Sequence, residues 1–363
     1  MTDARLPATL LTGFLGAGKT TLLNAMLADS SAGRIAIIVN EFGEAGLDHD
    51  LIEAVREDVV LMQSGCLCCS IRGDLSRTIA GLLERKSKGE IAFDRLVIET
   101  TGLADPGPIL QTLVIDTVLS RTVRMDGLIT VTDAANGPAT LDAQFEAVSQ
   151  VAMADLIVLS KTDLVSPDEV EGFKARLHHL NPGVPILKAV RGEGIAARLW
   201  GLAGNRTDVA PARAMAWAKG PAPSVDPLMN LSGLSPATPT PLRSAHHDAR
   251  IGSASIVLDD PIPDEVFDIW LDTLITLRGP DILRVKGIVF LTDMEKPFVF
   301  HGVQHIFERP VPLSNWSGDD RRSRIVVIAR DMSRPEIQAS LDMLRARMSS
   351  GRVRQSEQKD ASA

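Results

Sequence analysis

Cysteine is nearly absent from this chain of 363 residues, which holds only 3, at Cys66, Cys68 and Cys69. A framework of disulfides is disfavoured, because hydrophobic residues make up 45% of the sequence and can build a core without covalent staples. Adjacent cysteines such as Cys68 and Cys69 are also poor disulfide partners geometrically. The clustering of every thiol within one short segment therefore requires another explanation.

Long apolar segments are absent as well. No run of 18 or more apolar residues occurs, so no transmembrane helix is predicted. The apolar run near the start is short and leads into a glycine–lysine motif that the folded protein needs, which is unlike a signal peptide. We expect a cytoplasmic protein, in which thiols stay reduced.

The chain also lacks a basic excess, with a formal net charge of -8. Proteins that bind nucleic acids or anionic membranes carry a basic face, so neither partner is expected.

Strand-like and helix-like patterns alternate through the first 200 residues. Continuous apolar runs, typical of parallel strands buried on both faces, lie at 8–12, 34–39, 59–62, 95–99, 127–132, 155–160 and 184–189. Helical patterns lie between them at 19–28, 70–87, 107–120, 140–153 and 167–180. This alternation predicts a doubly wound α/β fold with a mostly parallel sheet.

The composition changes near residue 204. Residues 204–250 are rich in Pro, Ala and Ser without a clean period, which indicates a linker. Strands are then predicted at 253–258, 281–291, 296–303 and 324–329, with helices at 264–276 and 335–347. We expect an α/β domain over 1–203, a smaller α+β domain of ferredoxin-like type over 251–349, and a flexible tail over 350–363.

A phosphate-binding loop is predicted at residues 13–20, "GFLGAGKT", because this motif follows a predicted strand and precedes a helix. Its glycines allow backbone N–H groups to turn toward phosphate oxygens. Lys19 can reach the β- and γ-phosphates, and Thr20 can offer its hydroxyl to Mg²⁺. The residues expected to contact the nucleotide here are Gly13, Gly16, Ala17, Gly18, Lys19, Thr20 and Thr21.

Two further motifs follow in the order that a P-loop GTPase needs. "ETTG" at 99–102 ends a predicted strand, so Glu99 can hold a water of the Mg²⁺ shell and the Gly102 N–H can sense the γ-phosphate. "SKTD" at 160–163 ends a later strand. There Asp163 can accept hydrogen bonds from both N–H groups of a guanine edge, and the Lys161 stem can lie along the base. The usual motif is N-K-x-D, and Ser160 replaces its asparagine.

The cysteine cluster lies between the strand at 59–62 and the helix predicted from residue 70. A helix N-terminus lowers the pKa of a nearby thiol and favours the thiolate of Cys69. Three thiolates suit Zn²⁺ or another borderline transition ion, and three protein ligands leave one position open. A redox centre and simple packing of small apolar side chains remain the alternatives.

The loop at 39–50, "VNEFGEAGLDHD", follows the second strand, where a GTPase has its first switch. Glu41, Glu44 and Asp48 are hard oxygen donors. Glu41 could serve Mg²⁺, the cysteine-bound metal, or both in different states.

In this order, "LLTGFLGAGKTTLLN", "NEFGE", "GCLCC", "ETTGLADPGPI" and "SKTD" resemble the CobW-type GTPases, with the YjiA-like branch nearest in style. Segments "LRVKGIVFL" and "FVFHGVQHIF" are similar to the CobW C-terminal domain. The resemblance implies a slow P-loop GTPase and metallochaperone, with Cys66, Cys68 and Cys69 matching the metal motif. It also implies that Lys19, Thr20, Glu41 and Glu99 match the nucleotide–Mg²⁺ residues. The linker lacks the dense His tract of some members.

Our hypothesis is a metallochaperone that uses GTP and Mg²⁺ to control delivery of Zn²⁺ or Co²⁺ to an unidentified client metalloprotein, as a monomer or a nucleotide-dependent homodimer. Lys19, Glu99 and Glu41 are the expected catalytic residues, and the metal ligands are Cys66, Cys68, Cys69, Glu41 and Thr20. A non-hydrolysing nucleotide-binding metal sensor or buffer, a P-loop small-molecule kinase and a thiol redox switch are the alternatives.

Overall fold

The computed structural model describes residues 4–29, 33–40, 60–63, 71–202, 251–307, 310–314, 316 and 320–345. The chain divides into two compact units, Met1–Arg206 and Thr207–Ala363. The predicted linker at 204–250 and the tail at 350–363 lie outside the described residues, and their bounds stay predictions. Glu41 and the cysteine cluster at 66–69 also lie outside them.

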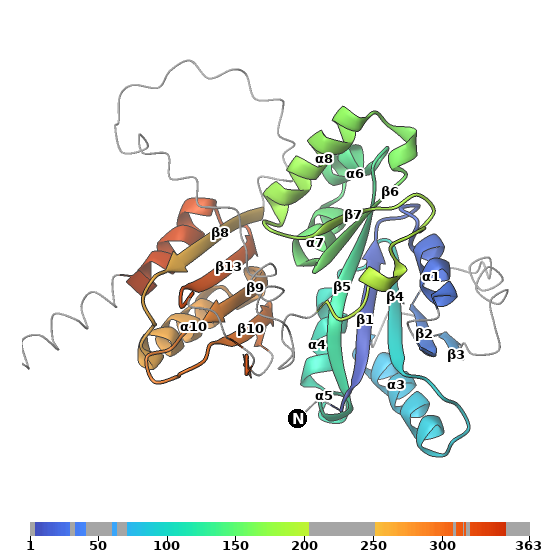
Figure 1. The fold of residues 1–363 in the computed structure, drawn as a ribbon, viewed down its shortest axis with the longest axis horizontal. Coiled ribbons are helices and arrows are strands. Elements are labelled where there is room, and N and C mark those ends of the chain that lie inside the picture. The colour runs from blue at the N-terminus through green and yellow to red at the C-terminus, as the bar shows by residue number, and fades with distance from the viewer. Residues whose placement is uncertain are drawn as a thin grey trace, which may run out of the picture. The chain divides into compact units, whose positions relative to one another are not determined.

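The first unit is built on a seven-stranded sheet in which every pairing is parallel, as predicted (Figure 1). Its strands are β1 (Leu6–Gly13), β2 (Ile35–Asn40), β3 (Val60–Gln63), β4 (Arg95–Thr100), β5 (Val123–Asp133), β6 (Leu156–Ser160) and β7 (Ile186–Lys188). The order across the sheet is β3-β2-β4-β1-β5-β6-β7, so β1 lies between β4 and β5. Because the strands are parallel, the carboxyl ends of β1, β4, β5 and β6 meet at one edge.

Helices cover this sheet. They are α1 (Lys19–Ala28), α3 (Ile71–Ser87), α4 (Gly107–Ile115), α5 (Leu119–Thr122), α6 (Gly137–Ala143), α7 (Phe145–Met153) and α8 (Pro167–Leu180). The helix expected over 107–120 was wrong as a single element, because it divides into α4 and α5. The helix expected over 140–153 also begins earlier and divides into α6 and α7.

The core of the first unit is the apolar interior of the strands. Ile37, Val97, Ile129 and Val158 come from β2, β4, β5 and β6, and each is at most 1% exposed. Strands buried on both faces need apolar side chains at successive positions, which is why their sequence runs are continuous.

The second unit is a smaller α+β domain with an antiparallel sheet. Its main elements are β8 (Ile251–Leu258), α10 (Asp264–Arg278), β9 (Ile282–Val289), β10 (Phe298–Val303), β13 (Ser323–Arg330) and a helix at 334–345. Two short strands, β11 (Ile306–Phe307) and β12 (Val311–Pro312), both pair with β10. The order is β11-β10-β9-β13-β8, so β8-α10-β9 is a split β-α-β unit of the ferredoxin-like kind, with β13 between its strands.

An aromatic cluster forms the core of the second unit. Phe267 and Trp270 of α10 are 4% and 2% exposed, and the Phe267 ring meets the Phe300 ring of β10 edge to face with centroids 5.2 Å apart. Leu274 completes the buried stripe of the helix at the spacing of one helix face.

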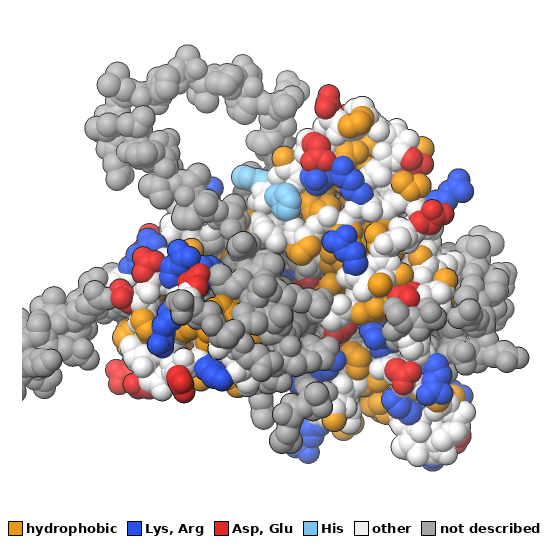
Figure 2. Space-filling view, in the orientation of Figure 1, with side chains coloured by type: hydrophobic (Ala, Val, Ile, Leu, Met, Phe, Trp, Pro, Cys, Tyr) orange, Lys and Arg blue, Asp and Glu red, His pale blue; other side chains and the backbone are white. Residues whose placement is uncertain are grey.

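Lys and Arg side chains lie among Asp and Glu on the face seen in Figure 2, rather than being gathered by sign. Among the described residues, no helix has the length and apolar character needed to cross a membrane.

Candidate nucleotide-binding site

The predicted phosphate loop connects β1 directly to α1 at the carboxyl edge of the sheet. Gly13, Gly16 and Gly18 have φ angles of 145°, 71° and 100°, which L side chains rarely adopt. At Gly13 a Cβ atom would also overlap the backbone of Val131 in β5. Only glycine fits at Gly13, and the positive φ angles favour glycine at Gly16 and Gly18.

Lys19 is the first residue of α1 and is only 8% exposed. Its Nζ donates to the carbonyl oxygen of Gly13 at 3.0 Å and lies 3.5 Å from that of Phe14. The cation is therefore folded over the loop whose N–H groups would receive phosphates. Thr20 and Thr21 follow in the first turn of α1, whose N-terminus favours anions.

The motif at 160–163 lies next to the phosphate loop. The Ser160 hydroxyl donates to the carbonyl oxygen of Ala17 at 2.6 Å and lies 3.1 Å from that of Thr132. Lys161 adopts a left-handed conformation with φ of 53°, and Asp163 follows in the 3₁₀ turn Thr162–Leu164. Ser160 thus bridges the phosphate loop to the predicted base-binding residues.

The third motif begins at the carboxyl end of β4. Glu99 is 2% exposed and pairs in the sheet with Leu11 of β1 and Val39 of β2. Gly102 approaches the phosphate loop so closely that an added Cβ would lie 2.5 Å from the backbone nitrogen of Leu15. The turn at 101–104 therefore lies against the loop where a γ-phosphate sensor is expected.

Asp133 is a residue of this edge that the sequence analysis missed. Its carboxylate accepts from Lys161 Nζ at 2.6 Å, from Asn136 Nδ2 at 2.9 Å and from the backbone N–H of Ala135 at 2.8 Å. Burial raises the pKa of Asp133, but these hydrogen bonds outweigh it and hold the pKa below its ordinary value. A signal existed, because Asp133 directly follows a predicted buried strand, just as Ser160 ends another.

Gln150 of α7 was also missed. It is 1% exposed, and its Nε2 donates to the carbonyl oxygens of Gly102 at 3.2 Å and Ala104 at 3.0 Å. The backbone carbonyl oxygen of Gln150 accepts from Thr130 Oγ1 at 2.7 Å. Gln150 therefore fastens the 101–104 turn to α7, a role that no local sequence pattern reveals.

Both units of the chain match known protein families. Residues 7–188 match the family described as CobW/HypB/UreG, nucleotide-binding domain, and residues 251–345 match the cobalamin synthesis protein cobW C-terminal domain. The chain belongs to the CobW/HypB/UreG family.

Relatives of this CobW-family chain include the zinc chaperone YjiA of Escherichia coli (strain K12), which is 32% identical over 93% of this chain and 98% of that protein. The zinc-regulated GTPase metalloprotein activator 1 of Schizosaccharomyces pombe is 35% identical over 51% of this chain and 46% of its own length. A crystal structure of Zn(II)-bound YjiA GTPase from E. coli superposes with a TM-score of 0.65 at 27% identity, covering 94% of this chain and 99% of that one.

The donors expected for Mg²⁺ fit that ion. Thr20 supplies a hydroxyl at the start of α1, and Glu99 supplies a buried carboxylate at the end of β4. Hard oxygen ligands of this kind are those that Mg²⁺ prefers.

The transition-metal ligands proposed from the sequence lie outside the described residues. Within the described part of the chain, no three His, Cys, Asp or Glu side chains are grouped to hold a metal ion. The cysteine site therefore stays a prediction from sequence.

Proposed function

We propose that this protein is a metallochaperone that binds and hydrolyses GTP and thereby controls a zinc ion held by Cys66, Cys68 and Cys69. The observation that carries the proposal is the meeting of three motifs at one sheet edge. The phosphate loop after β1, the turn after β4 and the 160–163 segment after β6 are joined by direct contacts. Three short motifs far apart in sequence rarely converge in this way by chance.

Lys19 has a defined part in the proposed reaction. Its ammonium now donates to carbonyl oxygens of the loop, and it would exchange these for β- and γ-phosphate oxygens when GTP binds. Backbone N–H groups of the loop and the α1 N-terminus add to the positive potential that stabilises the transferring phosphoryl group.

Glu99 and Thr20 are the proposed holders of Mg²⁺, with Glu41 as a further oxygen donor. Bound there, Mg²⁺ would neutralise charge that develops on the phosphates. The Gly102 N–H lies in the turn against Leu15 and is the proposed γ-phosphate sensor.

Asp163 and Lys161 are the proposed guanine-binding pair. The Lys161 ammonium is held by Asp133, which leaves its aliphatic stem to lie along a base. Asp163 would accept both N–H groups of the guanine edge, a pattern that adenine does not offer.

Zinc is the proposed cargo because three thiolates suit it and because the relatives' names refer to zinc. Cobalt is the alternative ion, since thiolates also bind it. The proposed recipient is a client metalloprotein. A nucleotide-dependent homodimer and a monomer are both compatible with this scheme.

Phosphate release from GTP tests the enzyme part of the proposal. Wild type should hydrolyse GTP slowly and prefer it to ATP, and Lys19→Ala should lose at least about 100-fold in rate, because the transition-state charge loses its cation. Lys88→Ala, which alters an exposed ion pair with Glu84, is the matched control and should retain the rate. Tight GTP binding without turnover would favour the sensor or buffer instead, and phosphate transfer to a small acceptor would favour the kinase.

A further inference from the structure

Three buried threonines form one row across the carboxyl edge of the first sheet. Thr100 is the last residue of β4, Thr12 is the next-to-last residue of β1, and Thr130 lies in β5. Thr12 and Thr130 are partners in the β1–β5 pairing, and Thr100 directly follows the β4 partner of Leu11, so it lies beside Thr12. Each of the three side chains is at most 1% exposed. These three residues are called the threonine row below.

The threonine row interrupts an otherwise apolar face of the sheet. Two residues earlier on the same strands, Ile98, Leu10 and Leu128 form the preceding row, and each is also at most 1% exposed. Valine has nearly the same shape as threonine and would pack there without a hydroxyl group to remove from water. Packing alone therefore does not account for three buried hydroxyl groups.

The hydroxyl groups of Thr12 and Thr100 connect the strand before the phosphate loop to the strand that carries Glu99. Their Oγ1 atoms lie 2.8 Å apart, and Thr100 Oγ1 lies 3.2 Å from the carbonyl oxygen of Thr101. Because a hydroxyl group can both donate and accept, the two contacts can be made together. Successive side chains of a strand point to opposite faces, so this pair holds the end of β4 from the face that Glu99 does not occupy.

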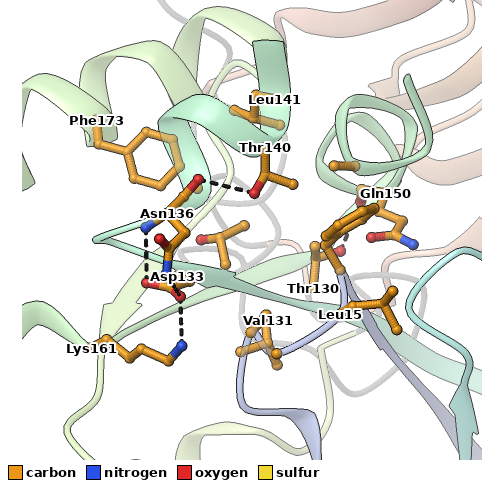
Figure 3. Close-up of a pocket in the computed structure, with 16 residues that line it drawn as sticks. Leu15, Thr130, Val131, Asp133, Asn136, Thr140, Leu141, Gln150, Lys161 and Phe173 are labelled. Atoms are coloured by element: carbon orange, nitrogen blue, oxygen red, sulfur yellow. Dashed lines mark hydrogen bonds and ion pairs between the residues drawn. The ribbon is translucent and has the colours of Figure 1, made fainter. Parts of the chain in front are cut away.

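Thr130 connects the threonine row to α7. Its hydroxyl donates to the backbone carbonyl oxygen of Gln150 at 2.7 Å, and the two residues lie side by side in Figure 3, at the pocket beside the phosphate loop. The Gln150 amide in turn binds carbonyl oxygens of the 101–104 turn. The turn is therefore held at its start by Thr100 and further along by Gln150, and both contacts lead back to the threonine row.

We propose that the threonine row is a positioning device that holds the segment 99–104 against the phosphate loop in the arrangement that accepts a γ-phosphate. This role rests on the proposed function, in which Glu99 holds Mg²⁺ and the Gly102 N–H senses the γ-phosphate. None of the three threonines is expected to touch the nucleotide, so they act through Glu99 and the turn. Since GDP lacks the γ-phosphate, its affinity should depend little on the row.

The test measures the affinities of the full chain for GDP and for a nonhydrolysable GTP analogue, each with Mg²⁺, by calorimetric titration. Thr100→Val keeps the shape of the side chain and removes the hydroxyl. It should weaken binding of the GTP analogue by about 3- to 10-fold, as expected for one hydrogen bond, and change GDP affinity by less than about 2-fold. Thr12→Val should act in the same direction. In the double variant the loss should be smaller than the product of the two single losses, because the two substitutions remove one shared contact.

Two further variants separate positioning from packing. Thr100→Ser keeps a hydroxyl and should retain the wild-type ratio of the two affinities. Thr9→Val makes the same exchange at a buried position of β1, three residues before Thr12, and should leave both affinities unchanged. Thermal unfolding shows that each variant is folded.

Equal losses of affinity for the GTP analogue and for GDP in Thr100→Val would overturn the positioning role, because they would indicate a general structural effect. Unchanged affinities in Thr100→Val would overturn it too, as would a loss of the same size in Thr100→Ser or Thr9→Val. Wild-type protein that binds neither nucleotide would overturn the proposed function together with the positioning role. Failure of the variants alone would leave the proposed function standing.

Discussion

At the scale of single residues, polar side chains at the ends of strands build the carboxyl edge of the sheet, where the nucleotide is proposed to bind. Ser160 stands where the usual base motif has asparagine, and its hydroxyl binds the Ala17 carbonyl oxygen at 2.6 Å. Asp133 holds Lys161 from the neighbouring strand. Serine, which is shorter than asparagine, can therefore still hold the 160–163 segment in place, because its hydroxyl contacts the phosphate loop directly.

Asp133→Asn should destabilise the protein by about 1–2 kcal/mol at pH 7, since a partly exposed charge-assisted contact is lost. The folded pKa of Asp133 lies below the ordinary carboxyl value of about 3.9, so its contribution is present above that pH and is lost as pH falls through the lower folded pKa. The difference in unfolding free energy between Asp133→Asn and wild type should therefore shrink below about pH 4. Urea unfolding at several pH values measures this.

Asp142→Asn is the matched control for that measurement, because Asp142 pairs with Arg176 at the surface. It should change stability by less than about 1 kcal/mol. A difference in unfolding free energy between Asp133→Asn and wild type that stays constant down to pH 3 would contradict a stabilising role for the charged Asp133 carboxylate.

Gln150→Leu should lower kcat for GTP by about tenfold or more while leaving GDP affinity nearly unchanged. The reason is that the Gly102 and Ala104 carbonyl oxygens lose their donor, so the turn that is proposed to meet the γ-phosphate would be misplaced. Single-turnover hydrolysis and GDP titration separate these effects. Gln144→Leu, between α6 and α7, is the control, and equal losses of GTP and GDP affinity in Gln150→Leu would argue for general unfolding of the site.

At the scale of elements, Asn181 shows how the C-terminal end of α7 is fixed in place. This residue after α8 is fully buried, and its Nδ2 donates to the carbonyl oxygens of Val151 and Ala154 at the end of α7, at 2.9 Å each. Carbonyl groups at a helix C-terminus lack partners within the helix, so a side-chain donor stabilises that end.

Asn181→Leu should therefore lower the free energy of unfolding by about 2–4 kcal/mol, because buried carbonyl oxygens at the α7 terminus are left without a donor. Chemical denaturation followed by circular dichroism measures it. Ser166→Ala, which removes the capping box of the more exposed α8 start, should cost about 1 kcal/mol and sets the scale. A cost for Asn181→Leu no larger than that of Ser166→Ala would contradict the capping role.

The strands were predictable from sequence because parallel buried strands require continuous apolar runs, as in β2 and β6. The helix breaks were not. Asp116 ends α4, and its carboxylate accepts from the backbone N–H groups of Val118 and Leu119, a local turn that interrupts an otherwise apolar helical pattern. Gln144 takes an extended conformation between α6 and α7, and glutamine is not a residue type that predicts a helix break.

For the site, the glycines and Lys19 were predictable because the motif itself fixes their geometry. Asp133 could have been found from its position after a buried strand. Gln150 could not, because a polar residue in the middle of a helix usually faces solvent, and only the tertiary structure shows that it is buried against the 101–104 turn.

At the scale of the whole molecule, chain order connects nucleotide and metal. The cysteine cluster lies in sequence between the loop that holds Glu41 and the turn after Glu99. Under the proposed function, GTP would order those segments and so change the affinity of the segment between them for the ion, and hydrolysis would release the ion to the client.

In the proposed mechanism, the nucleotide state of the protein controls its metal affinity. The most direct test is a Zn²⁺ titration of the full chain against a chromophoric competing chelator, with Mg²⁺ and either a nonhydrolysable GTP analogue or GDP. We expect the Zn²⁺ affinities of the two states to differ by about 5- to 150-fold, the range of typical allosteric coupling. Equal affinities in the two nucleotide states would contradict the claim.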